Sequence, residues 1–216
     1  MVPTVSRGRR TAAAVAAAGL GAEVFRSAQP VRARVARRRR RWRFIAVAGL
    51  AVSGGEWSKP AEIVVDDTVC ATYRARVDDG GHLVIALTLA DGWHTFAMDN
   101  QIRANEKLAG KKALGMDKPT SFVVSGGLTV DGPWMQPALL DFSKPELRIF
   151  SWGFAKQASF AAKVNRTGKA ARVGIRAQAC TETICKDINT SLDLDLALAA
   201  GPVEPGLSAL TPIRAQ

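Results

Sequence analysis

Residues 171–198, ARVGIRAQACTETICKDINTSLDLDLAL, contain two alternating segments on either side of a pair of cysteines. Before the cysteines, one face of a period-2 pattern carries Val173, Ile175, Ala177 and Ala179, and the other carries Arg172, Arg176 and Gln178. After them, Leu192, Leu194, Leu196 and Leu198 alternate with Ser191, Asp193 and Asp195. Strict alternation is typical of half-buried strands. The stretch therefore predicts two strands that hold two thiols at an edge or an end of a β-sheet.

The spacing of Cys180 and Cys185 is compatible with a structural bridge, half of a metal site or a redox couple. A bridge that closes about six residues constrains the unfolded chain by only about 2 kcal/mol, against nearly 5 for a loop of about 100 residues. A zinc site needs further ligands at short spacing, and His82, His94 and Cys70 do not provide them. We therefore predict no metal and no other cofactor. A short, accessible and reversible disulfide fits the spacing best.

Two segments resemble one protein family. Residues 178–185, QACTETIC, followed by a strand with alternating leucines, resemble the active-site segment of the N-terminal periplasmic domain of DsbD-type thiol:disulfide interchange proteins. Residues 89–96, LADGWHTF, are similar to a strand-turn segment of the same family that ends in a glycine and an aromatic cluster. The resemblance covers residues 59–198. The family commonly has prolines after its second cysteine, where this chain has Lys186 and Asp187.

The resemblance implies an immunoglobulin-like antiparallel β-sandwich that relays reducing equivalents by dithiol–disulfide exchange. It implies that Cys185 bonds to the partner protein and that Cys180 resolves the mixed disulfide. The implied partners are a membrane electron donor and oxidised clients, which are thioredoxin-like proteins or disulfide isomerases, in the periplasm and in connection with cytochrome c assembly. Because the sequence shows neither a multi-span membrane domain nor a thioredoxin-like domain, we expect electrons to come from separate proteins.

The family also covers its cysteines with a cap loop that bears an aromatic residue and acidic residues. The matching segment here is residues 140–144, LDFSK, with Phe142 as the cap and Asp141 as the nearby acid. We expect Phe96, His94 and Trp93 to line the same pocket. The alternatives are that Phe142 is ordinary core, and that His94 is a hydrogen-bonded structural residue instead of a proton carrier.

The net charge of +11 comes from the N-terminal part of the chain. Residues 1–43 contain twelve arginines and one acidic residue, Glu23, which leaves the remainder electrically balanced. The folded part is therefore not expected to present a basic face, and we predict no nucleic-acid partner for it.

The apolar run Phe44–Val52 follows the arginines and is too short to span a bilayer. Together with the small residues Ala51, Ser53 and Gly54, it predicts a secretory signal in residues 1–53, with cleavage near Ser53 and a periplasmic or otherwise exported mature chain. No membrane span is expected in that chain. A twin-arginine signal at Arg9-Arg10, a misplaced start, and a cytoplasmic arginine tail that contacts RNA or anionic lipid are the alternatives.

Short β-type segments follow at spacings of about ten residues and predict the sandwich in residues 54–199. Asp78-Asp79-Gly80-Gly81 predicts a hairpin between strands 68–77 and 82–89, and Cys70 on the first of these is predicted to be a small buried residue. Further expectations are a polar loop at 99–115 with one helical turn, a hairpin around residues 125–127, strands at 147–152 and 158–164, and a turn at 165–169. The tail, residues 200–216, is predicted to be unstructured.

A second function remains open from the residues alone. The sandwich would then be a non-catalytic binding module in which the Cys180–Cys185 bridge only stiffens a loop. The sequence has no nucleophile elbow, phosphate loop or dinucleotide fingerprint that would indicate another enzyme class.

Overall fold

The computed structural model describes residues 56–111, 118–198 and 200–214. The predicted leader, residues 1–53, lies outside the described residues. The elements in chain order are β1 (Ala61–Val65), β2 (Thr68–Val77), β3 (His82–Leu89), β4 (His94–Phe96), α1 (Asn100–Leu108), β5 (Ser121–Val130), β6 (Met135–Gln136), β7 (Leu140–Asp141), the 3-10 helix η1 (Pro145–Leu147), β8 (Trp152–Ala155), β9 (Gln157–Cys180), β10 (Cys185–Asp195), the 3-10 helix η2 (Leu207–Ala209) and β11 (Thr211–Pro212). The all-β prediction is confirmed.

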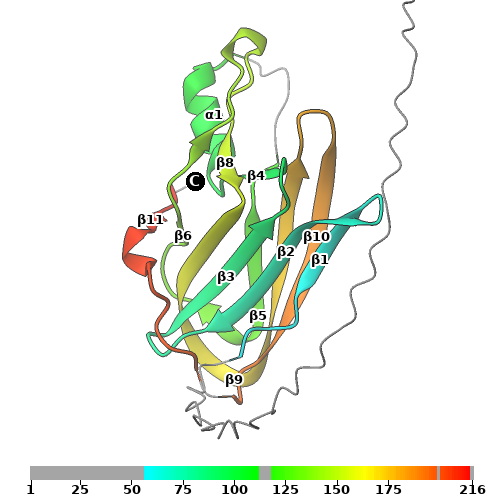
Figure 1. Ribbon diagram of the computed structural model, residues 1–216. Coiled ribbons are helices and arrows are strands. Elements are labelled where there is room, and N and C mark those ends of the chain that lie inside the picture. Colours follow the sequence, from blue (N-terminus) through cyan, green and yellow to red (C-terminus); the bar gives the residue numbers. More distant parts are fainter. Residues whose placement is uncertain (1–55, 112–117, 199, 215–216) are drawn as a thin grey trace, which may run out of the picture. The chain divides into compact units, whose positions relative to one another are not determined.

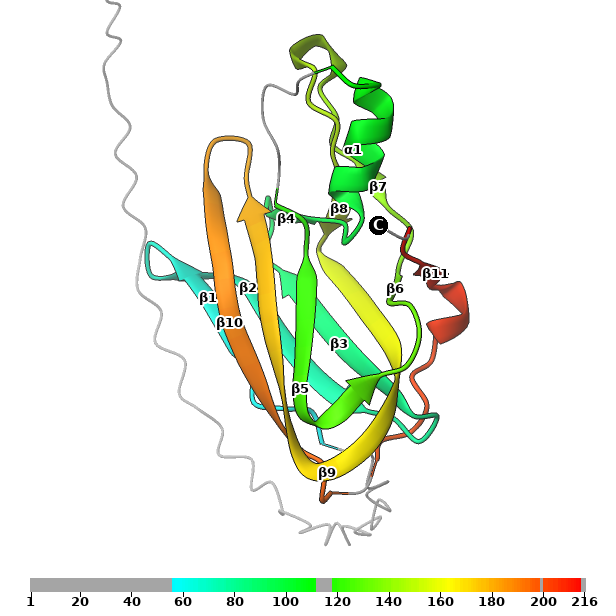
Figure 2. The ribbon, with the colours of Figure 1, turned by 180° about the vertical axis from the view of Figure 1, so that it is seen from behind.

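Two antiparallel layers enclose the core, and the long strand β9 belongs to both (Figures 1 and 2). Its first part, residues 157–163, pairs with β3, which pairs in turn with β2 and β1. Its second part, residues 170–180, pairs with β10, β5 and β4. Alternating apolar residues from both layers point inward, among them the fully buried Tyr73 and Phe160. The hairpin of β2 and β3 has the predicted bounds, and Cys70 is buried in the core, as predicted.

The predicted turn at 165–169 and the predicted hairpin around 125–127 are both wrong. Residues 165–169 continue β9, and residues 125–127 lie within β5, which shifts register between Gly126 and Leu128. The glycines serve a close crossing of the two strands: a Cβ on Gly127 would lie 2.7 Å from the Cα of Gly168. Glycines that indicate turns in the sequence therefore allow two bent strands to pass from one layer to the other.

Two other local predictions are also corrected. The segment expected to be a loop with one helical turn contains the nine-residue helix α1, which is anchored by the buried residues Asn100 and Leu108. The strand expected at 147–152 is a 3-10 turn followed by an extended segment, because Arg148 adopts a left-handed conformation with φ of 55°. Strand β8 begins only at Trp152.

The C-terminal residues 200–214 are ordered against the sandwich, which contradicts the predicted unstructured tail. Strand β11 pairs with β6, and two buried aspartates accept backbone N–H groups of the tail: Glu204 N donates to Asp78 Oδ2 at 3.2 Å, and Arg214 N donates to Asp99 Oδ2 at 3.1 Å. Arg76 forms an ion pair with Glu204 at 2.5 Å. Polar partners distant in sequence hold the tail, and a periodicity pattern does not record such contacts.

Candidate redox site

The two cysteines lie at the tip of the β9–β10 hairpin. Strand β9 ends at Cys180 and β10 begins at Cys185, and the two residues face each other across the hairpin with a Cα–Cα distance of 4.1 Å. Their sulfurs form a disulfide. The expectation that two strands hold both thiols at the end of a sheet is confirmed. The tip lies at the same end of the domain as helix α1 (Figures 1 and 2).

Hydrogen bonds hold the turn between the cysteines without help from the bridge. Thr181 N donates to the carbonyl of Ile184 at 2.8 Å, and its Oγ1 accepts from the backbone N–H groups of Thr183 and Ile184, each at 3.2 Å. Below the tip, the strands pair in continuous register to Asp195. The hairpin is therefore specified by backbone pairing as well as by the disulfide.

The two sulfur-bearing residues differ in exposure. Only 3% of Cys180 is exposed, whereas Cys185 is an exposed residue. By strand alternation Cys180 belongs to the outer face of its sheet, together with the polar side chains of Arg176 and Gln178. Since Cys180 is nevertheless buried, side chains must cover it from outside the sheet. An incoming group can reach Cys185 directly and Cys180 only after this cover moves.

His94 lies on the other side of Cys180. Strand β4 pairs with β9 so that His94 is directly opposite Cys180, and with β8 so that His94 is directly opposite Ala155. Cys185, Cys180, His94 and Ala155 thus occupy one cross-strand row on four adjacent strands. Side chains in such a row share one face, with Cβ atoms of neighbours about 5 Å apart. The imidazole and the buried sulfur are therefore next to each other on the outer face.

The predicted aromatic residues gather around His94. The ring of Phe142 stacks on the imidazole with centroids 4.5 Å apart, and the ring of Phe96 meets it edge-on at 5.4 Å. Trp93, His94 and Phe142 line one surface pocket of about 190 Å³. Phe96 is buried beneath the imidazole and does not line this pocket. The structure thus brings together four of the predicted site residues, with the imidazole between Phe142 and the row of cysteines.

Asp141 is exposed and belongs to the cap segment instead of the pocket lining. Its Oδ1 accepts from the backbone N–H of Ser143 at 2.8 Å, and hydrogen bonds from Ser143 and Trp152 hold the pKa of the Asp141 carboxyl below its usual value. The next residue, Phe142, donates its backbone N–H to Ser151 at 2.9 Å. These bonds orient the segment that presents the Phe142 ring.

The sequence analysis missed a polar cluster immediately below the disulfide. Gln178 and Asp187 lie opposite each other, and Gln178 Nε2 donates to Asp187 Oδ1 at 3.0 Å. Lys118 forms an ion pair with the same carboxylate, which lowers the pKa of Asp187. Because Gln178 and Asp187 are each two residues from a cysteine, hairpin symmetry was a signal for the first contact. The sequence held no signal for Lys118.

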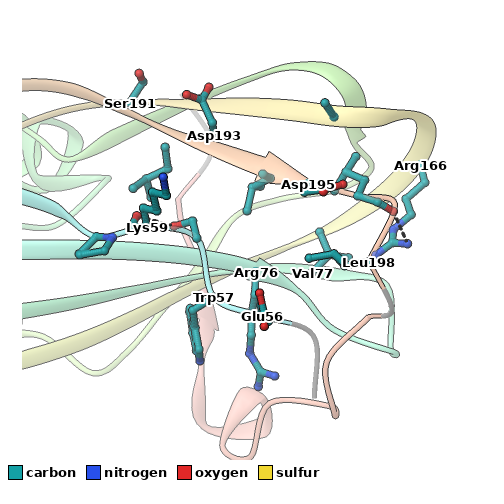
Figure 3. Close-up of a pocket in the computed structure, with 16 residues that line it drawn as sticks. Glu56, Trp57, Lys59, Arg76, Val77, Arg166, Ser191, Asp193, Asp195 and Leu198 are labelled. Atoms are coloured by element: carbon teal, nitrogen blue, oxygen red, sulfur yellow. Dashed lines mark hydrogen bonds between the residues drawn. The ribbon is translucent and has the colours of Figure 1, made fainter. Parts of the chain in front are cut away.

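A groove of about 770 Å³ lies elsewhere on the domain (Figure 3). It is lined by residues 56–60, by Arg76 and Val77 of β2, and by the distal part of β10 and the residues after it. The guanidinium of Arg76 stacks over the Trp57 ring at 4.9 Å from the centroid and also binds Glu204. None of the cysteines lines this groove. Cavity size alone would therefore have directed attention away from the disulfide.

Within residues 56–111, 118–198 and 200–214, no cluster of three or more His, Cys, Asp or Glu side chains is arranged to hold a metal ion. In the same part of the chain, no helix has the length and apolar character needed to cross a membrane. The fold and the site together define a class: an all-β sandwich that carries a disulfide at the tip of a hairpin, with one sulfur-bearing residue exposed and the other buried.

Comparisons with known proteins place this description beside two solved structures. No known protein-family description matches the sequence, and a search among curated proteins finds no significant match. The chain is similar to the N-terminal periplasmic domain of ScsB from Proteus mirabilis, with 17% sequence identity and a TM-score of 0.49; the match covers 69% of this chain and 54% of that one. It is also similar to the N-terminal domain of DsbD from Neisseria meningitidis in the reduced form, with 13% identity and a TM-score of 0.40, over 57% of this chain and 82% of that one. The chain thus spans about half of the ScsB structure, and both matches fall in the class of domain that the sequence resemblance named.

Proposed function

We propose that this chain is a thiol–disulfide exchange domain that relays reducing equivalents through a reversible Cys180–Cys185 disulfide. The observation that carries the proposal is the unequal exposure of the two cysteines: Cys185 is exposed and Cys180 is 3% exposed. Exchange requires one sulfur that meets the partner and a second that resolves the mixed disulfide. An exposed and a buried cysteine in one hairpin supply these two roles without competition between them.

The reaction starts from the reduced domain and an oxidised client protein. The thiolate of Cys185 attacks one sulfur of the client disulfide, and the other client sulfur leaves as a thiolate that takes up a proton. Cys180 then loses its proton and attacks the Cys185 sulfur, so that the Cys180–Cys185 bond forms while the bond to the client breaks. The client gains two electrons and two protons as a dithiol. A dithiol of a membrane electron donor restores the reduced domain by the same steps in reverse.

We further propose that this exchange takes place in the periplasm or another exported compartment, with thioredoxin-like proteins or disulfide isomerases as clients and a connection to cytochrome c assembly. The arginine-rich and apolar pattern of residues 1–53 supports export. Disulfides also persist in exported compartments, whereas the cytosol keeps thiols reduced.

The alternative is a structural bridge in a binding module. The contacts of the turn argue against it, because Thr181 already ties the loop through backbone and side-chain hydrogen bonds. A bridge around about six residues then adds only about 2 kcal/mol by the chain-entropy estimate. A surface disulfide that the fold does not need for stability is free to be opened and closed.

The reduction potential of the pair distinguishes the two functions. We expect a value of roughly −270 to −120 mV, the range of working oxidoreductases, when the full chain is equilibrated in glutathione buffers and its thiols are alkylated and counted by mass spectrometry. A value below about −300 mV would make the bridge structural.

Single-cysteine variants test the two roles. Cys180→Ser keeps the exposed sulfur and is expected to accumulate a mixed disulfide with a client or with glutathione. Cys185→Ser keeps only the buried sulfur and is expected to trap at least about tenfold less under the same conditions, since access limits exchange. Equal trapping by the two variants, or exchange that persists in both, would refute the proposed function.

A further inference from the structure

The resolving step places a demand on a buried sulfur. Cys180 must lose a proton before it attacks the mixed disulfide at Cys185, and it is 3% exposed. Burial disfavours the thiolate form of a cysteine. A buried thiol with no access to water therefore resolves a mixed disulfide efficiently only if a neighbouring group accepts its proton.

His94 is placed to accept that proton. It is directly opposite Cys180 on the adjacent strand, so the imidazole and the thiol share the outer face of the sheet at neighbouring positions. It also lines the surface pocket with Trp93 and Phe142. The ring thus has the buried sulfur on one side and a route to solvent on the other.

We propose that His94 is a catalytic residue that takes the proton of Cys180 as the mixed disulfide resolves and returns it in the reverse direction. This inference rests on the proposed exchange function. In the forward step, the Cys180 sulfur bonds to the Cys185 sulfur while the bond between Cys185 and the client breaks. The proton of Cys180 passes to the imidazole, the client sulfur leaves with the bonding electron pair and takes a proton from solvent, and the imidazolium then releases its proton to water in the pocket.

The groups around the ring are compatible with a proton carrier. The cap contributes Phe142, β4 itself contributes Phe96, and β8 contributes Ala155. The titratable residues that line the pocket besides His94 are Asp91 and Lys156, one acid and one base. Asp141 belongs to the adjoining cap segment and is ionised at neutral pH because Ser143 and Trp152 lower its pKa. Histidine is the side chain whose ordinary pKa, about 6.5, suits proton transfer near neutrality.

The test is the pH dependence of the resolving step in three forms of the full chain: the parent, His94→Gln and His82→Gln. The chain has only two histidines, so His82, which bonds to Asp78 at the start of β3, is a matched control. Each reduced protein is mixed rapidly with oxidised glutathione. Samples are then quenched with acid, and the glutathionylated and disulfide forms are followed by mass spectrometry.

We expect the rate of resolution in the parent to rise as an imidazole deprotonates, with a midpoint near pH 6 to 7. In His94→Gln that step should disappear, and the rate at neutral pH should fall by about 100-fold, the lower end of general acid–base contributions. His82→Gln should follow the parent. A parent-like profile in His94→Gln would overturn the inference.

NMR titration provides a second readout that does not depend on the stability of a variant. The two histidine C2–H signals are followed with pH in the reduced and in the oxidised parent protein. We expect the midpoint of His94 to differ between the two states, because its neighbour changes from a thiol to a disulfide, and that of His82 to stay constant. An unchanged His94 midpoint contradicts the inference. If exchange survives both single-cysteine substitutions, the proposed function itself fails; if it requires both cysteines but not His94, only this inference fails.

Discussion

Gly153 on β8 lies so close to Thr95 on β4 that a Cβ at residue 153 would be 1.8 Å from the Thr95 carbonyl oxygen. No side chain fits there without moving one of the two strands. Because Thr95 follows His94, this approach sets the position of the strand that carries the imidazole. Thr95 Oγ1 also donates to the carbonyl of Gln178 at 2.8 Å, which ties β4 to β9 just before Cys180.

Gly153→Ala is therefore expected to push β8 and β4 apart. Overpacking of this kind typically costs about 1 to 3 kcal/mol of unfolding free energy. We expect that loss in urea unfolding, together with slower exchange as His94 moves from Cys180. Gly174→Ala on β9 is the matched control, because its Cβ would meet Val123 at an ordinary 3.7 Å. Equal stability in the two variants would show that β8 is free to move.

Phe142→Ala separates the cap from the core interpretation of this residue. Removal of a cap should expose His94 and Cys180, so we expect the reduced protein to react several-fold faster with oxidised glutathione while it loses less than about 2 kcal/mol of stability. Ordinary core phenylalanines cost about 3 to 5 kcal/mol when replaced by alanine. Leu147→Ala, on the exposed turn of the same segment, is the control and should leave both quantities unchanged.

Asp99 makes stability depend on pH in acid. Burial raises the pKa of its carboxyl, but hydrogen bonds from Arg103, Gln136 and the backbone N–H of Arg214 outweigh burial and hold the pKa below its usual value. The folded-state pKa is therefore lower than the unfolded one of about 3.9, so this contribution is present above about pH 4 and is lost as the pH falls through the folded-state value.

We expect Asp99→Asn to reduce the unfolding free energy at neutral pH by at least about 1.5 kcal/mol, the scale of a hydrogen bond to a charged group, and to flatten its decline in acid. Denaturant titrations between about pH 2 and 7 measure both. Asp193→Asn, whose exposed carboxylate pairs with Arg172, should change stability little. A parent-like acid decline in Asp99→Asn would assign that decline to other carboxylates.

The polar cluster of Gln178, Asp187 and Lys118 is expected to keep the two strands together when the disulfide is open. Asp187→Asn should loosen the reduced hairpin and lower the effective concentration of one thiol at the other. The disulfide then becomes easier to reduce, by less than about fivefold in the glutathione equilibrium, because exposed pairs are weak. Asp193→Asn breaks an equivalent pair on the same strand away from the cysteines and should leave the equilibrium unchanged. A shift of the same size in both variants would indicate a general charge effect.

Local pattern in the sequence was sufficient for several elements. Period-2 alternation predicted the strands on either side of the cysteines, and Asp78-Asp79-Gly80-Gly81 predicted the β2–β3 hairpin with its observed bounds. The burial of Cys70 followed from its place in an apolar strand. These features depend on residues near one another in the chain, where backbone preference and the alternation of side chains already specify the outcome.

Tertiary contacts decided the rest. The glycines at 127 and 168 form a crossing of two strands instead of two turns, and buried Asp78 and Asp99 order a tail that has no pattern of its own. The site depends on such contacts as well: alternation places Cys180 on the polar face, yet it is buried, and only the pairing of β4 with β9 puts His94 beside it. A period of two tells which face a residue takes but not which strand lies next to it, because neighbours in a sheet are chosen by packing over the whole domain.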